Sequence, residues 1–194
     1  MIRFLTAGES HGPELTAIVE GFPAGLPLEP GIINQDLMRR QKSEGSGGRM
    51  SIETDTVKFT AGVMNKLTTG GPICMVITNR DFASWRNRDI SPMTIPRPGH
   101  ADLNAAIKYS YHDLRLGLER ASARETAARV SVGALCRSLL SYFGIAVGSY
   151  VVSIGNIEAC PPEHVDFTQL MKVAEDNPVR CPDPTAAQEM INLI

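Results

Sequence analysis

The segment 122–143 constrains the fold more than any other part of this chain. Its apolar residues recur at spacings of three and four, at Ala128, Val132, Leu135, Leu139 and Phe143. This spacing is typical of a helix with one buried face. Gly144 follows, at the place where a left-handed residue commonly closes a helix. The sequence therefore predicts a long helix from Ser122 to Phe143 that packs one face against other elements.

Shorter patterns predict further helices and strands along the chain. Helices are predicted at 30–41 (with Ile33 and Leu37 on one face), 101–118, 166–175, and from Asp183, where Asp-Pro resembles a cap and first helical residue. Strands are predicted at 16–20, 52–63, 72–78 and 145–152, of which 72–78 is a continuous apolar run. Glycine, proline and polar residues predict loops at 42–48 and 81–99.

Composition restricts the class of protein. The chain has 194 residues, which is enough for one domain with a core, and its 43% hydrophobic and 21% charged content is ordinary for a soluble globular protein. A net charge of -2 gives no general attraction to nucleic acid or to an anionic membrane. There is no apolar run of membrane-spanning length and no secretory signal at the N-terminus. We therefore predict a cytoplasmic protein without nucleic-acid or membrane partners.

Cysteines and histidines give no sign of a metal site. The four cysteines form no C-x-x-C pair, and the four histidines are dispersed along the chain. We predict neither a bound metal nor a disulfide. Cys74 and Cys136 lie in apolar segments and are interpreted as buried, reduced thiols.

The run Glu119–Thr126 has the composition of an anion site. It holds two arginines, the Ser122 hydroxyl and small residues at the start of the long helix. Small residues let a ligand approach the backbone, and arginine forks and a hydroxyl suit phosphate or carboxylate. Free N–H groups at a helix start add to this. A structural alternative is a capping box of Ser122 and Glu125, and the two interpretations are compatible.

Two histidines are candidates for proton transfer, because histidine titrates near neutral pH. His11 lies in a polar turn and His100 follows Arg97-Pro98-Gly99. The structural alternatives are a turn histidine and a helix-capping histidine. Nearby acids at positions 9, 55 and 102 are interpreted as orienting or capping groups rather than bases.

A cluster of arginines flanks the glycine-rich loop. Arg39, Arg40 and Arg49 form either a solvated basic face or a lid over a polyanion.

Three long motifs together resemble the chorismate synthase family. They are TAGESHGPELTAIVEGFPAGLPL from Thr6, GGRMSIETD from Gly47, and RPGHADL from Arg97 with LERASARETAARV from Leu118. Members of that family are about twice as long, so residues 1–194 are interpreted as the N-terminal portion of a single family domain whose C-terminal half is absent. The resemblance implies an α/β (α+β) layered sandwich, with long helices between antiparallel sheets.

The resemblance also implies an activity. The family is a lyase of the shikimate pathway, in aromatic amino-acid biosynthesis, that converts 5-enolpyruvylshikimate 3-phosphate to chorismate and phosphate by 1,4-elimination. It requires reduced FMN, with electrons ultimately from NADPH or another reductant, and it is a homotetramer. One alternative is an inactive truncated fragment that retains partial FMN or anion binding. A phosphosugar enzyme of the kinase or mutase type is a weaker alternative.

Individual roles follow from the matched positions. The resemblance implies that His11 helps the phosphate to leave and that His100 protonates the reduced flavin. Arg120, Ala121 and Ser122 match the flavin-binding segment. Arg40, Arg49 and Ser46 stand at the positions of the segment that binds substrate or NADP in the family.

Three positions depart from the family pattern. Ser46 stands where an arginine is usual and Glu44 where an aromatic residue is common, which predicts weaker binding of an anion. Lys66 stands where the family often has glycine, and we expect the backbone to adjust.

The isolated chain is also expected to lack activity and to associate. The reason is that the last predicted helix would expose an apolar face of Ala187, Met190, Ile191 and Ile194.

Overall fold

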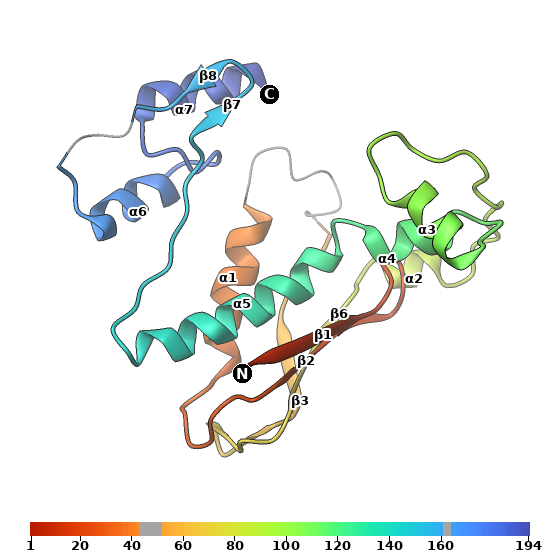
Figure 1. Ribbon diagram of the computed structural model, residues 1–194, viewed down its shortest axis with the longest axis horizontal. Helices are drawn as coiled ribbons and strands as arrows, with labels where there is room; N and C mark the ends of the chain where they lie inside the picture. Colours follow the sequence, from red (N-terminus) through yellow and green to blue (C-terminus); the bar gives the residue numbers. More distant parts are fainter. Residues whose placement is uncertain (43–51, 161–163) are drawn as a thin grey trace.

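The computed structural model describes residues 1–42, 52–160 and 164–194. Its main body is an antiparallel four-stranded sheet with the strand order β1-β2-β6-β3 (Figure 1). The strands are β1 (Arg3–Ala7), β2 (Glu14–Glu20), β3 (Val57–Ala61) and β6 (Ile73–Thr78). Two helices, α1 (Pro30–Gln41) and α5 (Glu125–Ser141), cover one face of this sheet. The predicted α+β class is confirmed.

The core lies between the sheet and these two helices. Alternate side chains of the central strands are buried there, as the period of two requires: Leu15, Ala17, Val19, Ile73, Met75 and Ile77. They face the predicted apolar faces of α1 and α5, which are confirmed except for Phe143, an exposed residue beyond the end of α5. On the opposite face of the sheet, Cys74 is half-buried and Ile18 is exposed, so the deepest burial of β6 is on its core face.

The two ends of α5 differ from the prediction in different ways. The C-terminal cap is confirmed: Gly144 has φ +69°, its N–H donates to the Ser141 carbonyl, and the Ile145 N–H donates to the Leu140 carbonyl, both at 3.1 Å. The N-terminus lies later than predicted. Ser122 is extended, with φ -64° and ψ 155°, and it ends α4 (Arg115–Ala121) rather than starting α5.

A small helical lobe follows β6 and precedes α5 (Figure 1). It contains α2 (Phe82–Trp85), inside a predicted loop, and α3 (Asp102–Tyr109), which packs against α4. The prediction of one helix over 101–118 is wrong, because Ser110 is left-handed, with φ 57° and ψ 42°, and ends α3.

The C-terminal residues form a second lobe with an apolar cluster of its own. Its elements are β7 (Ser153–Ile154), β8 (Ile157–Glu158), α6 (Phe167–Glu175) and α7 (Pro184–Leu193). Asp166 caps α6, and, as predicted, Asp183 caps α7 ahead of Pro184. Ala187 and Met190 are buried in this cluster, so the expectation that they would be exposed is wrong, whereas Ile194 is exposed. Residues 145–152, predicted as a strand, form an irregular link between the body and this lobe (Figure 1).

The cysteines differ in burial. All four are free; Cys181 is buried in the C-terminal lobe, whereas Cys74 and Cys136 are only half-buried, contrary to prediction. Burial nevertheless raises the pKa of the Cys136 thiol. Within the described ranges, no helix has the length and apolar character needed to cross a bilayer, and no group of three or more potential metal-ligating side chains is found.

Lys66 lies in the tight turn of a small hairpin between β4 (Val63–Met64) and β5 (Leu67–Thr68). Asn65 has φ 50° and Lys66 has φ 64°, which is the left-handed pair that a two-residue hairpin turn requires. The expected backbone adjustment is therefore a left-handed lysine, a conformation that glycine adopts without steric cost.

We expect Lys66→Gly to raise the free energy of unfolding by about 0.5 kcal/mol. A left-handed non-glycine residue costs roughly 1–2 kcal/mol, which the glycine variant recovers. The greater entropy of glycine in the unfolded chain offsets about half of this gain in stability. The ion pair of Lys66 Nζ with Glu29 Oε1, at 3.0 Å, is exposed and contributes little. Urea denaturation measures the change, and Asn65→Gly is the control with a smaller gain, since asparagine tolerates this conformation. A loss of stability in Lys66→Gly would show that the ion pair outweighs the strain.

Candidate active site

His11 lies in the loop between β1 and β2 and is fixed at three points. Its ring Nδ1 is 2.7 Å from Glu119 Oε1, and its backbone N–H donates to Glu119 Oε2 at 2.8 Å. The imidazole also packs on the Trp85 ring, with centroids 3.8 Å apart. Thus α4 and α2 together hold a histidine whose side chain keeps 22% of its surface exposed. A fixed but accessible imidazole is suited to proton transfer.

Asn79, directly after β6, fastens the backbone of the same loop. Its Nδ2 donates to the carbonyls of Glu9, Ser10 and Gly12, at 3.2, 3.3 and 2.8 Å. The Ser122 hydroxyl also lies 3.0 Å from the Ser10 hydroxyl. The residues that precede and follow His11 are therefore held as firmly as its ring.

A buried charge cluster of Arg40, Glu53, Asp55 and Arg124 lies beneath this loop. Arg124 donates to Asn79 Oδ1 at 2.6 Å and to Asp55 Oδ1 at 2.5 Å, and Arg40 donates to Asp55 Oδ2 at 2.7 Å. The Glu53 carboxylate is 3.8 Å from Arg124. The side chains of Arg124 and Asp55 are 1% and 0% exposed. Charges at this depth require partners, and the cluster supplies them, so it supports the loop structurally.

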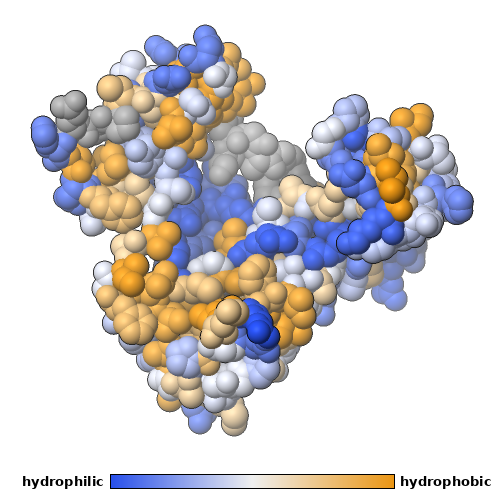
Figure 2. All heavy atoms as spheres, viewed as in Figure 1, coloured by the Kyte–Doolittle hydropathy of each residue, from blue (hydrophilic) through white to orange (hydrophobic). Residues whose placement is uncertain are grey.

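Arg120 and Ala121 border a different space, a hollow between α3 and α4 of about 640 Å³. Its wall also carries Lys108, Arg129 and the stacked rings of Tyr109 and Tyr111, 5.3 Å apart. Hydrophilic side chains gather along α4 and the start of α5 in Figure 2, whereas hydrophobic ones gather over the later part of α5. The hollow thus combines aromatic rings with cations.

Glu125 and Thr6 engage the Arg120 guanidinium. Arg120 pairs with the Glu125 carboxylate and donates to the Thr6 carbonyl at 2.8 Å. Glu125 also accepts from the Thr6 hydroxyl at 2.6 Å and lies 3.2 Å from Arg129. The predicted capping box of Ser122 and Glu125 is wrong, because Glu125 is committed to these ion pairs and Arg124 is the residue at the N-cap.

His100 is exposed in its own turn. Its Nδ1 lies 2.9 Å from the Pro98 carbonyl, and Arg97 and Asp102 hold the turn through bonds of 2.8 and 3.0 Å. The capping alternative for His100 is wrong, because α3 has Ala101 at its N-cap and no side-chain cap. Among the residues that the structure describes, no hydrogen bond or ring contact joins His100 to His11.

The ion pair of Arg97 and Asp102 predicts a specific pH dependence. The hydrogen bond from Arg97 lowers the pKa of Asp102 from 3.8 to about 2. A carboxyl group whose pKa is lowered by folding stabilises the fold at any pH above its pKa in the unfolded chain. This stability is lost as the pH falls from about 4 toward 2. We expect the contribution to be at most about 2 kcal/mol, and less because the Arg97 side chain is 42% exposed.

Urea denaturation between pH 2 and pH 6 tests this expectation. Asp102→Asn should flatten that part of the stability profile, and Asp89→Asn, which leaves the Arg97 pair intact, should not. An unchanged profile in Asp102→Asn would contradict the assignment.

The predicted site residues therefore fall into separate groups. Ser122 contacts the His11 loop, Arg120 and Ala121 line the hollow, and Arg40 belongs to the buried charge cluster. Ser46 and Arg49 lie outside the described residues. Arg39 pairs instead with Asp36 and Glu175, both at 3.3 Å.

Sequence analysis missed three residues that hold His11: Trp85, Asn79 and Glu119. Glu119 lies inside a recognised motif, next to Arg120, but it is 108 positions from His11, and no local spacing indicates their contact. The acids Asp55 and Asp102, interpreted as orienting groups, are both ion-pair partners of arginine.

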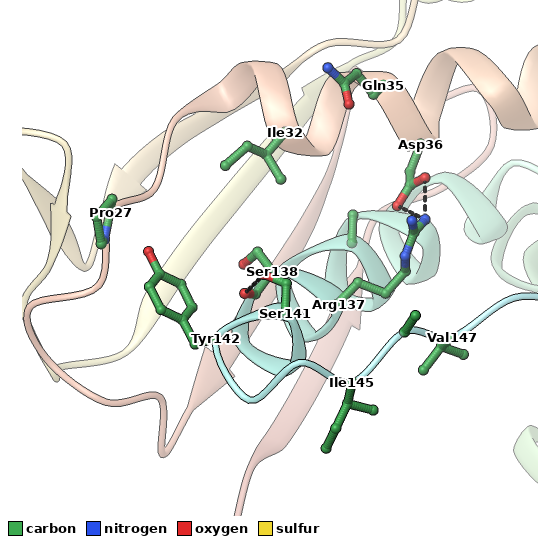
Figure 3. A pocket seen from close by; sticks show the side chains of 12 residues that line it. Pro27, Ile32, Gln35, Asp36, Arg137, Ser138, Ser141, Tyr142, Ile145 and Val147 are labelled. Atoms are coloured by element: carbon green, nitrogen blue, oxygen red, sulfur yellow. Dashed lines mark hydrogen bonds and ion pairs between the residues drawn. The ribbon is translucent and has the colours of Figure 1, made fainter. Parts of the chain in front are cut away.

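A separate groove between α1 and the end of α5 carries none of the predicted site residues. It encloses about 380 Å³ and is lined by apolar side chains such as Ile32, Tyr142 and Ile145. Figure 3 shows Arg137 pointing at Asp36 beside it, with both carboxylate oxygens accepting, at 2.7 and 2.8 Å. Asp36 also pairs with Arg39, at 3.3 Å. Because none of the predicted site residues lines this groove, it is not the candidate site.

Comparisons with known proteins agree on one family. A sequence model described as chorismate synthase matches residues 2–194. The chorismate synthase of Geobacillus thermodenitrificans is 49% identical over 204 aligned residues, and that of Symbiobacterium thermophilum is 48% identical over 208; each alignment covers 100% of this chain and 53% of the relative. A crystal structure of chorismate synthase superposes with a TM-score of 0.76 at 43% identity, covering 99% of this chain and 51% of that one. The chain spans about half the length of the curated relatives it matches.

Proposed function

Because the chain belongs to the chorismate synthase family, we propose that it acts in converting 5-enolpyruvylshikimate 3-phosphate to chorismate and phosphate. Residues 1–194 would supply the N-terminal portion of one family domain. The family match across residues 2–194 is the observation that carries this proposal. A homotetramer, NADPH as a source of electrons and a cytoplasmic location are proposed on the family resemblance alone.

The proposed reaction breaks the bond between carbon and the phosphate oxygen and removes one ring proton, so that a new double bond forms. His11 is proposed to give a proton to the departing phosphate, since its imidazole is held firmly and remains accessible. His100 is proposed to hold a proton for the flavin from its rigid Arg97–Asp102 turn.

The hollow beside Arg120 has side chains suited to reduced FMN. Two stacked tyrosine rings suit a flat aromatic group, and Lys108 suits a phosphate, beside Arg120 and Arg129, which both pair with Glu125. When bound, the reduced flavin supplies transient electron density that weakens the bond to phosphate, with no net redox change. Ala121 has a small side chain on this wall and allows close approach of a ring. Ser122, which contacts Ser10, connects the hollow to the His11 loop.

The second candidate is a chain that binds FMN or another anion without turnover. It is favoured by one observation: the hollow is formed within this chain, and its ion pairs hold Arg120 in place. Binding could therefore persist where catalysis does not.

Anaerobic assay with reduced FMN and 5-enolpyruvylshikimate 3-phosphate separates these candidates. Formation of chorismate supports the enzyme, and tighter FMN binding in the presence of substrate supports the hollow as its site. Binding without product supports the second candidate. If neither FMN binding nor product is observed, both candidate functions are contradicted.

A further inference from the structure

The contact between His11 and Glu119 determines which ring nitrogen carries the proton. A carboxylate offers acceptors only. Glu119 Oε2 accepts the His11 backbone N–H at 2.8 Å, and Oε1 lies 2.7 Å from Nδ1. Nδ1 must therefore be the donor, which places the hydrogen of the neutral ring on Nδ1 and leaves the lone pair on Nε2.

We propose that Glu119 is a positioning residue that holds neutral His11 as the Nδ1–H tautomer and leaves Nε2 to exchange protons with the substrate. Within the described parts of the chain, Nε2 has no hydrogen-bond partner. The Trp85 ring, 3.8 Å away, restricts rotation of the imidazole, and Asn79 restrains the backbone on both sides. The ring can thus present Nε2 in one direction only.

The catalytic consequence rests on the proposed function. In that reaction the doubly protonated ring gives its Nε2 proton to a phosphate oxygen, and the Nδ1–H stays in place. The nearby carboxylate stabilises the charged ring before transfer, and the ring after transfer is already the tautomer that Glu119 selects. No proton has to move on the Glu119 side.

Glu119→Gln gives a sharp test, because the backbone N–H of His11 fixes how the amide must lie. That N–H needs the single amide oxygen as its acceptor, which places the amide NH2 against Nδ1. Nδ1 must then accept, so the hydrogen moves to Nε2. The substitution keeps the shape of the side chain but is expected to reverse the tautomer.

Nitrogen-15 NMR of the neutral His11 ring reads the tautomer without any substrate. We expect Nδ1–H in the native chain, Nε2–H in Glu119→Gln, and the native pattern in Glu14→Gln, an exposed control three residues after His11. An Nε2–H tautomer in the native chain, or the same tautomer in both Glu119 forms, would overturn the proposal. The measurement on the native chain alone tests the assigned tautomer, even if Glu119→Gln does not fold.

Turnover gives the second readout. Glu119→Gln should lower kcat by roughly 10²-fold, the usual size of a lost acid or base contribution, with little change in KM. A reversed tautomer with unchanged kcat would overturn the catalytic role of Glu119. If even the native protein forms no product while the tautomer still reverses, the proposed function fails and the assignment of the tautomer stands.

Discussion

Arg124→Met will lower the free energy of unfolding by about 3–5 kcal/mol, the usual cost of removing one partner of a buried ion pair. Arg124 compensates Asp55 and Glu53, and it also donates to Asn79. Methionine fills part of the volume but supplies no donor and no charge. Urea denaturation followed by circular dichroism measures the shift in midpoint.

Arg129→Met is the matched control on the same helix. Arg129 also pairs with a carboxylate, Glu125 at 3.2 Å, but its side chain is 58% exposed, so its loss should cost less than about 1 kcal/mol. The double variant Asp55→Asn with Arg124→Met should lose less stability than the sum of the two single variants, because both changes remove the same ion pair. A loss below 1 kcal/mol in Arg124→Met would show that water reaches the cluster.

His11→Ala is the second change with a large expected effect, this time on the proposed turnover. We expect a fall in kcat of roughly 10²-fold or more, because the reaction loses its positioned acid. Folding should remain near normal, since the ring is partly exposed and Asn79 still holds the loop through its backbone. Anaerobic turnover and the thermal unfolding midpoint are the two measurements.

His100→Ala tests the other proposed proton donor. His100 is exposed and bonds the Pro98 carbonyl of its own turn, so its loss should leave stability nearly unchanged while lowering turnover by a similar factor. Normal turnover in either variant would remove that histidine from the mechanism, and unfolding of the variant would show a structural role instead.

Sequence predicted the elements whose signals are local. The apolar faces of α1 and α5, the left-handed Gly144 and the aspartate cap of α7 all depend on residues a few positions apart. The break at Ser110 could not be read in this way, because a left-handed serine leaves no mark in the apolar pattern. Residues 145–152 have the composition of a strand, but strand formation also requires a partner, which the pattern does not reveal.

The same difference between local and long-range signals applies to the candidate site. The motifs identified His11 and Arg120 by type and neighbourhood, but not the side chains that hold them. Glu119 reaches His11 across 108 positions and Arg124 reaches Asp55 across 69. Such contacts arise because α4 lies against the His11 loop and α5 packs on the sheet, which a single sequence does not encode in any local pattern.

The fastening of the His11 loop has a consequence for its dynamics. Surface loops usually open independently of the core, at little free-energy cost. Here the amide hydrogens of Ser10 and His11 are both bonded to Glu119, and the loop carbonyls are bonded to Asn79, which in turn contacts the buried Arg124. Opening the loop therefore disturbs the core, and hydrogen exchange at these two amides should follow global unfolding rather than local fluctuation. His11 is therefore expected to move on the slow timescale of the protein interior, although its ring is partly exposed to solvent.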